Sequence, residues 1–176
     1  MVLWLLMALR TKPVQQRLRL TQALPYVIPT GLGAYLIFNR PDALQRLSLW
    51  WPWISSHAWV AVVGVAMTAT GLLFSLWARL YLGRNWSGQV TVKEDHELIR
   101  SGPYRFVRHP IYSGLLLALA GTTLCFGNVW GILGFALVWL GLWIKSRIEE
   151  QFMVATFGPQ YEEYRRTTGA IVPQFR

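Results

Sequence analysis

The feature that most limits how this chain can fold is a run of 34 residues, 111 to 144, without a charged side chain. A second uncharged run, residues 58 to 78, is 21 residues long. Because a helix rises about 1.5 Å per residue, roughly 20 apolar residues are enough to cross the hydrocarbon core of a bilayer. A hydrophobic fraction of 53% with only 14% charged residues is also unusual for a soluble domain. The sequence therefore predicts an integral membrane protein with an all-α fold.

The 34-residue run is too long for one membrane span and short for two. The Gly127-Asn128 pair divides it into two arms, 111 to 126 and 129 to 144, each about 24 Å long as a helix. We expect a tight helical hairpin over residues 110 to 147, in which each arm is extended by its polar flank. Both ends of the hairpin would then lie next to each other on the same side of the membrane.

Two further spans are predicted in the N-terminal half. Residues 20 to 38 are apolar, and Pro25 and Pro29 should kink this helix or unwind its first turns. The span at the second uncharged run carries Gly64 and Gly71 seven positions apart, so a neighbouring helix can approach it closely. The first nine residues are also apolar and predict either an interfacial segment or the end of a span; the sequence leaves both open.

The net charge of +9 is concentrated beside the apolar runs and does not follow one face of a soluble domain. Attraction to anionic lipid headgroups explains this pattern, and we predict no nucleic-acid partner. Six basic residues lie between 79 and 108 and five from 145 onward, against two in the tryptophan-rich loop after the first span. By the positive-inside rule, both ends and the 79 to 108 region are cytoplasmic, which gives a multi-pass protein with four spans. Cys125 lies within an apolar run and predicts a buried side chain without a disulfide.

Several familiar catalytic motifs are missing from the sequence. The chain contains no glycine-rich dinucleotide loop, no phosphate-binding P-loop, no H-E-x-x-H and no C-x-x-C. Its three histidines do not have the spacing of a metal site, so we predict no bound metal. The remaining candidate is the dense polar segment from His96 to Gly114, which leads directly into the hairpin.

The polar segment contains R-H-P-x-Y-x-G at 108 to 114, and the Glu149-Glu150 pair follows the second arm of the hairpin. Arg108 and His109 at the start of a helix suit a carboxylate or a phosphate. The two glutamates can accept hydrogen bonds from ribose hydroxyls or an ammonium, and the tyrosines of the segment offer rings to a purine or a cation. Together these groups fit a ligand with an anionic end, a cationic centre and a nucleoside, such as S-adenosylmethionine.

The same residues also have a simpler interpretation. Arginine and histidine beside a span usually contact lipid headgroups, and a Glu149-Glu150 pair beyond a span is usually solvated or paired with Arg147. Charges of both signs at the two ends of one hairpin need partners, which favours a ligand site. On the residues alone, a cofactor site and a set of lipid anchors both remain open.

Three parts of the sequence together resemble the isoprenylcysteine carboxyl methyltransferase family and its phospholipid methyltransferase relatives. They are the segment Gln89 to Tyr112, the Glu149-Glu150 pair, and F-G-x-x-Y-x-x-Y at 157 to 164. Members of this family are membrane enzymes that use S-adenosylmethionine without a Rossmann domain. The resemblance covers about half of the chain. It implies a cofactor-binding region at residues 85 to 176, whereas residues 1 to 84 are expected to form helices on the lipid and substrate side.

The resemblance implies a specific set of cofactor contacts. They are Gln89, His96, Glu97, Leu98, Ile99, Tyr104, His109, Pro110, Ile111, Tyr112 and Glu149. A basic residue shortly before the glutamates is associated with the substrate in this family. By spacing it is Lys145, with Arg147 as the nearby alternative. The family often has an arginine at this point, so Lys145 leaves the identity of the substrate open.

The resemblance also implies the reaction, which is methyl transfer from S-adenosylmethionine to a lipid or lipidated acceptor, with the cofactor site on the cytoplasmic face. A carboxylate acceptor, as in isoprenylcysteine carboxyl O-methylation, is already ionised and needs no base. Lys145 or Arg147 would hold it, and Arg108 would support the cofactor-side geometry. An amine acceptor, as in phospholipid N-methylation, needs a base, and Glu150 is the candidate. The sequence also leaves open a nicotinamide-dependent membrane reductase and a non-enzymatic membrane protein.

Overall fold

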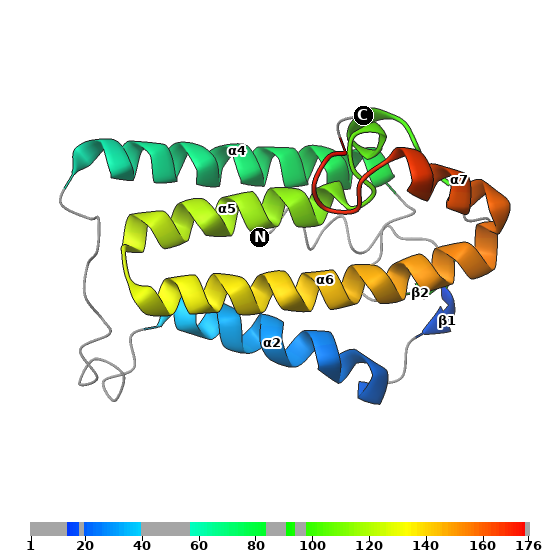
Figure 1. The fold of residues 1–176 in the computed structure, drawn as a ribbon, viewed down its shortest axis with the longest axis horizontal. Coiled ribbons are helices and arrows are strands. Elements are labelled where there is room, and N and C mark those ends of the chain that lie inside the picture. The colour runs from blue at the N-terminus through cyan, green and yellow to red at the C-terminus, as the bar shows by residue number, and fades with distance from the viewer. Residues whose placement is uncertain (1–13, 18–19, 40–56, 84–90, 94–97, 175–176) are drawn as a thin grey trace.

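The computed structural model describes residues 14–17, 20–39, 57–83, 91–93 and 98–174. The apolar first nine residues and the tryptophan-rich loop lie outside these ranges. The main elements are four long helices, which are α2 (Leu20–Phe38), α4 (Ala58–Leu82), α5 (Pro110–Phe126) and α6 (Val129–Phe157). Figure 1 shows them side by side along the long axis of the molecule, in the order α4, α5, α6, α2. The fold is therefore helical, as the sequence predicts.

Helices α4 and α5 pack at very short range because small residues line both faces. A Cβ added at Gly114 of α5 would lie 2.6 Å from the carbonyl oxygen of Gly71 and 2.7 Å from the backbone nitrogen of Ser75. About two turns further along, the backbones of Gly64 and Gly121 meet in the same way. A side chain at these glycines would collide with the facing helix, so the two helices can approach this closely only because the side chains are absent. The predicted close approach to the Gly64 and Gly71 face is confirmed.

Helices α2 and α6 form a second close pair. A Cβ at Gly134 of α6 would lie 2.6 Å from the carbonyl oxygen of Gly33 in α2. Pro25 and Pro29 lie inside α2, which is a continuous helix from Leu20 to Phe38, so the prolines do not unwind its first turns. The α2 bounds match the predicted span at both ends.

The turn between α5 and α6 has the predicted position. Gly127 has a positive φ of 59° and its N–H donates to the carbonyl oxygen of Thr123 at 3.0 Å, which ends α5. Asn128 then caps α6, because its Oδ1 accepts a hydrogen bond from the backbone nitrogen of Gly131 at 2.6 Å. The predicted hairpin over 110 to 147 needs one correction, since α6 continues as far as Phe157. The charged residues that follow the uncharged arm are good helix formers, so they continue the same helix.

Among the described helices, α4 and α6 are long and apolar enough to cross a bilayer by length and composition. Large apolar side chains on α4 face outward, such as Val62 and Leu73, which are 67% and 68% exposed. Helices with this pattern are typical of a lipid environment. The prediction of four spans also requires α2 and the 17-residue α5, and it stays a prediction.

The prediction of an all-α chain omits one small element. Strand β1 (Val14–Arg17) pairs antiparallel with strand β2 (Thr91–Lys93), with Val14 opposite Lys93 and Arg17 opposite Thr91. Strands of four and three residues are too short to show an alternating pattern in the sequence. The sheet joins the segment before α2 to the segment that follows α4.

The C-terminal part of the chain returns to the start of α5. The 3-10 helix η2 (Gly102–Arg105) precedes α5, and α7 (Pro159–Thr167) follows α6 after Gly158. Residues 168–172, the C-terminal strap, then run beside the end of the polar segment (Figure 1). The strap is anchored by Ile171, which is 8% exposed and belongs to the same hydrophobic cluster as Leu116 and Leu142.

Candidate active site at the start of the helical hairpin

An ion pair between Arg108 and Glu150 joins the two ends of the hairpin. Nε and Nη2 of Arg108 both donate to Oε1 of Glu150, at 2.9 and 2.6 Å. The Arg108 side chain is 7% exposed and that of Glu150 is 3% exposed. The structure therefore brings together the two polar clusters that flank the hairpin, as predicted from the sequence.

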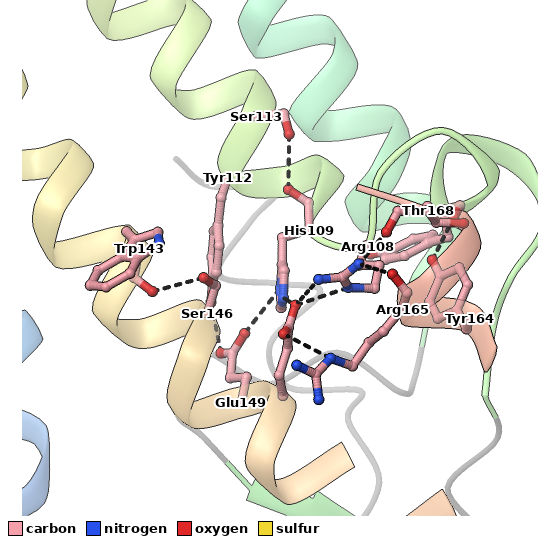
Figure 2. Close-up of polar contacts among 12 residues, drawn as sticks. Arg108, His109, Tyr112, Ser113, Trp143, Ser146, Glu149, Tyr164, Arg165 and Thr168 are labelled. Carbon is pink, nitrogen blue, oxygen red and sulfur yellow. Dashed lines mark hydrogen bonds and ion pairs between the residues drawn. The ribbon is translucent and has the colours of Figure 1, made fainter. Parts of the chain in front are cut away.

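The C-terminal segment fixes Arg108 from the other side. Nη1 of Arg108 donates to the carbonyl oxygens of Thr168 and Arg165, the latter at 3.2 Å. The backbone nitrogens of Arg108 and His109 donate to the carbonyl oxygens of Gly169 and Ala170 at 2.8 and 2.9 Å. Both the guanidinium and the peptide groups of this segment are thus held by the strap, as Figure 2 shows for the guanidinium.

His109 lies between the two glutamates. Its Nε2 is 3.3 Å from Oε1 of Glu150, and its Nδ1 is 3.5 Å from Oε2 of Glu149. Burial disfavours the charged imidazolium, but the hydrogen bonds and charges of both carboxylates outweigh this effect and raise the pKa of His109. Carboxylates facing both ring nitrogens favour the form in which both carry a proton.

Tyr112 completes the wall beside His109. The two rings are stacked, with centroids 5.4 Å apart and an angle of 3° between their planes (Figure 2). The hydroxyl of Tyr112 donates to Oε1 of Glu149 at 2.7 Å. Because Tyr112 lies in the first turn of α5 and Glu149 lies on α6, this bond also links the two arms of the hairpin.

Of the two basic candidates before the glutamates, Lys145 reaches this cluster. Its Nζ lies 3.9 Å from Oε1 of Glu149 and 5.5 Å from the centroid of the Tyr112 ring. Arg147 is exposed, and its guanidinium lies 5.9 Å from the ring centroid of Trp143. Residues two positions apart lie on nearly opposite faces of a helix, so α6 can direct only one of the two basic residues to Glu149.

Five other predicted contact residues are described by the structure but form no side-chain hydrogen bond or ion pair with the two glutamates. Tyr104 is 7% exposed, and its hydroxyl donates to the carbonyl oxygen of Ala78 in α4 at 3.4 Å. Pro110 and Ile111 are buried in the first turn of α5. Leu98 and Ile99 are half-buried in irregular backbone. A role in cofactor binding stays a prediction for each of these five residues.

Three predicted cofactor contacts lie outside the described residues. They are Gln89, His96 and Glu97. The cluster of described side chains at the start of the hairpin therefore does not include them, and their role in binding stays a prediction.

The structure adds residues that the sequence patterns did not indicate. Arg165 of α7 places its Nε 3.5 Å from Oε2 of Glu150. Tyr26 of α2 places its ring centroid 5.6 Å from Nζ of Lys145. The tyrosine pattern at 157 to 164 is a signal that α7 belongs to the site, because Tyr161 and Tyr164 are buried at 3% and 5% exposure. No sequence pattern connects Tyr26 to the site.

One oxygen of Glu150 and the charge balance of the cluster indicate which kind of ligand the residues fit. Oε2 of Glu150 is buried without a hydrogen bond to another described residue, and the nearby Arg165 nitrogen makes an ion pair only. A buried acceptor of this kind suits a hydroxyl or ammonium donor of a ligand. The basic side chains of the cluster are Arg108, His109, Lys145 and Arg165, against two glutamates, and this excess of positive charge suits an anionic group. The residues therefore fit a ligand that carries both a carboxylate and donor groups.

Comparison with known proteins decides the family. The family described as phospholipid methyltransferase matches residues 59–160. Protein-S-isoprenylcysteine O-methyltransferase A of Arabidopsis thaliana is 32% identical over 125 residues, which are 69% of this chain and 64% of that protein. A probable protein-S-isoprenylcysteine O-methyltransferase of Oryza sativa subsp. indica is 32% identical over 145 residues, 79% of this chain and 75% of that protein. The chain belongs to the isoprenylcysteine and phospholipid methyltransferase family.

A solved structure shares the fold. The eukaryotic intramembrane Ras methyltransferase ICMT, an isoprenylcysteine carboxyl methyltransferase, superposes with a TM-score of 0.61 at 24% identity over 84% of this chain. The match covers 52% of that chain, and the Arabidopsis thaliana relatives A and B are matched over 64% and 65% of their length. The chain therefore spans about half to two thirds of these family members, and the residues that match the family model, 59–160, include the hairpin.

Proposed function

We propose that this protein transfers a methyl group from S-adenosylmethionine to the carboxylate of an isoprenylated cysteine held in the membrane. The observation that carries the proposal is the buried cluster of Arg108, His109, Glu149 and Glu150 at the start of the hairpin. Charged side chains are costly to bury beside an apolar hairpin, and in membrane proteins such residues mark binding or catalytic sites. The names of the relatives, protein-S-isoprenylcysteine O-methyltransferases, support the reaction and the acceptor.

The roles follow from the contacts of each side chain. When bound, S-adenosylmethionine supplies an electrophilic methyl group on a sulfonium. Glu149 and Glu150 would accept hydrogen bonds from its hydroxyl and ammonium groups, and His109 and Arg108 would hold the glutamates and offer positive charge to its carboxylate. The ring of Tyr112 would form a wall of the site. The remaining predicted contacts, from Gln89 to Tyr104, belong to the same proposal.

A carboxylate acceptor agrees better with the cluster than an amine acceptor does. Methylation of an amine requires a base, and Glu150 is the candidate that the sequence offers. Oε1 of Glu150 accepts two hydrogen bonds from Arg108 and also faces His109, so the carboxylate is strongly stabilised as an anion and is a poor proton acceptor. A carboxylate acceptor needs no base, and Lys145 would pair with it. Catalysis would then depend on alignment of the two substrates and on exclusion of water.

The membrane arrangement is part of the proposal. Helices α2, α4, α5 and α6 would each span the bilayer, with both ends of the chain and the Arg108–Glu150 pair on the cytoplasmic side. Residues 1–84 would shape the lipid and acceptor side, whereas residues 85–176 would bind the cofactor. S-adenosylmethionine would enter from the cytoplasm, and the lipidated acceptor would enter laterally from the membrane.

Titration of the purified protein in micelles with S-adenosylmethionine and with NADPH tests the cofactor. We expect binding of S-adenosylmethionine alone, weakened at least tenfold in His109→Ala and Glu149→Ala. The exposed Glu163→Ala is the matched control and should bind like the unaltered protein, because its side chain is 76% exposed on α7. Binding of NADPH alone, or equal affinity in all four proteins, would contradict the proposed site.

A further inference from the structure

We propose that Tyr26 of α2 is a positioning residue for the acceptor, holding Lys145 between its own ring and that of Tyr112 so that the ammonium meets the acceptor carboxylate. The inference rests on the proposed carboxyl methylation and adds to it a role for the N-terminal half of the chain. Tyr26 lies on α2, before the residues 59–160 that match the family model.

Three helices converge on the ammonium of Lys145. Its Nζ lies 5.6 Å from the ring centroid of Tyr26 on α2 and 5.5 Å from that of Tyr112 on α5, while Lys145 itself extends from α6. Both distances are within the range of a cation–π interaction, about 6 Å. Tyr26 is 9% exposed and the Lys145 side chain 14%, so the contacts are largely removed from water. Desolvated contacts of this kind are stronger than exposed ones.

Lys145 is placed where a membrane-borne carboxylate would meet the protein. It is the first charged residue after the uncharged arm 129 to 144, so its ammonium lies at the edge of the apolar part of α6. Arg108, in contrast, is buried and makes four hydrogen bonds to Glu150, Arg165 and Thr168. An acceptor anchored by its lipid would therefore pair with the ammonium and not with the guanidinium.

The position of Tyr26 is fixed by the close pairing of α2 and α6. A Cβ at Gly141, one turn before Lys145, would lie 2.8 Å from the carbonyl oxygen of Tyr26 and would also meet Oγ1 of Thr30. That hydroxyl of Thr30 donates to the same carbonyl oxygen at 2.6 Å. The absence of a side chain at Gly141 thus lets the backbone of Tyr26 lie directly on α6.

A lysine at a membrane boundary needs this restraint. Its long side chain normally extends toward the lipid headgroups, which leaves the ammonium mobile and hydrated. The contacts with the two rings hold it near Glu149, at 3.9 Å, and keep it facing the cluster. The Lys145 side chain is then already ordered before the acceptor binds. Less conformational entropy is lost on binding, which raises the affinity for a carboxylate.

The test compares N-acetyl-S-farnesylcysteine with its carboxamide in detergent micelles. We expect the unaltered protein to bind the carboxylate more tightly than the carboxamide. Tyr26→Leu should weaken binding of the carboxylate about 3- to 30-fold, the size of a cation–π contact, and leave the affinities for the carboxamide and for S-adenosylmethionine unchanged. Tyr26→Phe keeps the ring and should restore most of the preference. Tyr35→Leu is the matched control on the same helix, since Tyr35 is 49% exposed, and should behave like the unaltered protein.

A double-mutant comparison adds a second readout. In a Lys145→Met background, Tyr26→Leu should cause no further loss of preference for the carboxylate, because the ring then has no cation to hold. Unchanged preference in Tyr26→Leu, or equal weakening of both farnesyl probes, would overturn the inference. Failure of the proposed function is distinguishable from this, because it would show as absent methyl transfer in the unaltered protein while the Tyr26-dependent preference persisted.

Discussion

Arg108 and Glu150 lie 42 positions apart in the sequence and form a pair in which two guanidinium nitrogens donate to one carboxylate oxygen, at 2.9 and 2.6 Å. Both side chains are almost fully buried. Because Arg108 also donates to the backbone at Arg165 and Thr168, the pair joins three parts of the chain: the start of the hairpin, its far arm and the segment from α7 to the strap. The site is thus assembled from elements that the sequence keeps apart.

Removing the charge of Glu150 should destabilise the folded protein strongly. In Glu150→Gln the shape is kept, but Arg108 loses its counter-charge in a buried position, which costs about 3–5 kcal/mol. The measurement is the free energy of unfolding in micelles. Glu163→Gln, which breaks an exposed pair of 3.9 Å with Arg100, should change it by less than about 1 kcal/mol. Equal small effects from both substitutions would contradict the structure.

The protonation of His109 should make stability depend on pH in a defined direction. Its pKa in the folded protein is raised, because Glu149 and Glu150 outweigh the effect of burial. The folded state therefore binds the proton more tightly than the unfolded chain. The resulting stabilisation is complete below the unfolded value of about 6.5 and is lost as pH rises through the folded pKa. Unfolding temperatures should therefore fall between neutral and alkaline pH more steeply in the unaltered protein than in His109→Gln; parallel pH profiles would refute this.

Replacing either of two glycines in α2 by alanine should change the stability of the protein in opposite directions. A Cβ at Gly33 would lie 2.9 Å from two atoms of Val138 and would also meet the carbonyl oxygen of Gly134, whereas nothing lies within 4 Å of a Cβ at Gly31. Gly33→Ala should cost about 1–3 kcal/mol of stability by forcing α2 away from α6. Gly31→Ala should be neutral or gain up to about 1 kcal/mol from helix propensity. If unfolding measurements rank the two variants in the other order, the α2–α6 pairing is wrong.

The C-terminal strap should support the site through Ile171. This side chain is 8% exposed in the core, whereas the neighbouring Val172 is 58% exposed. Ile171→Ala should lower stability by about 2–5 kcal/mol and weaken binding of S-adenosylmethionine, because residues 169 and 170 hold the backbone of Arg108 and His109. Val172→Ala should change stability by less than about 0.5 kcal/mol. Normal cofactor affinity in a folded Ile171→Ala protein would show that the strap does not support the site.

Much of the helical framework was predictable because it depends on local signals. An uncharged run determines the position of α2, and the Gly127-Asn128 pair marks the turn of the hairpin. Small residues at helical spacing, such as Gly64 and Gly71, mark the face that contacts α5. The extension of α6 to Phe157 was missed, since charged residues after an apolar run do not show whether the helix continues.

Which side chains meet in the cluster is harder to predict, because this depends on which face of each helix is turned toward its neighbours. Lys145 and Glu149 are four positions apart and so share a face of α6, which in principle favours Lys145 over Arg147. The contacts of the strap with the backbone of Arg108 and His109 are made by carbonyl groups, which leave no pattern in the sequence. Tyr26 reaches Lys145 only through the packing of α2 on α6, which a single sequence does not specify.

The most direct test of the proposed reaction is to incubate the purified protein with S-adenosylmethionine labelled in its methyl group and with N-acetyl-S-farnesylcysteine. A carboxyl methyl ester is cleaved by mild base and releases methanol, whereas a methyl group on an amine is stable to base. The proposal predicts label in the farnesylcysteine product, released by base, and its loss in Glu149→Ala. No transfer to this acceptor, or base-stable label on a phospholipid amine added in its place, would contradict the proposal.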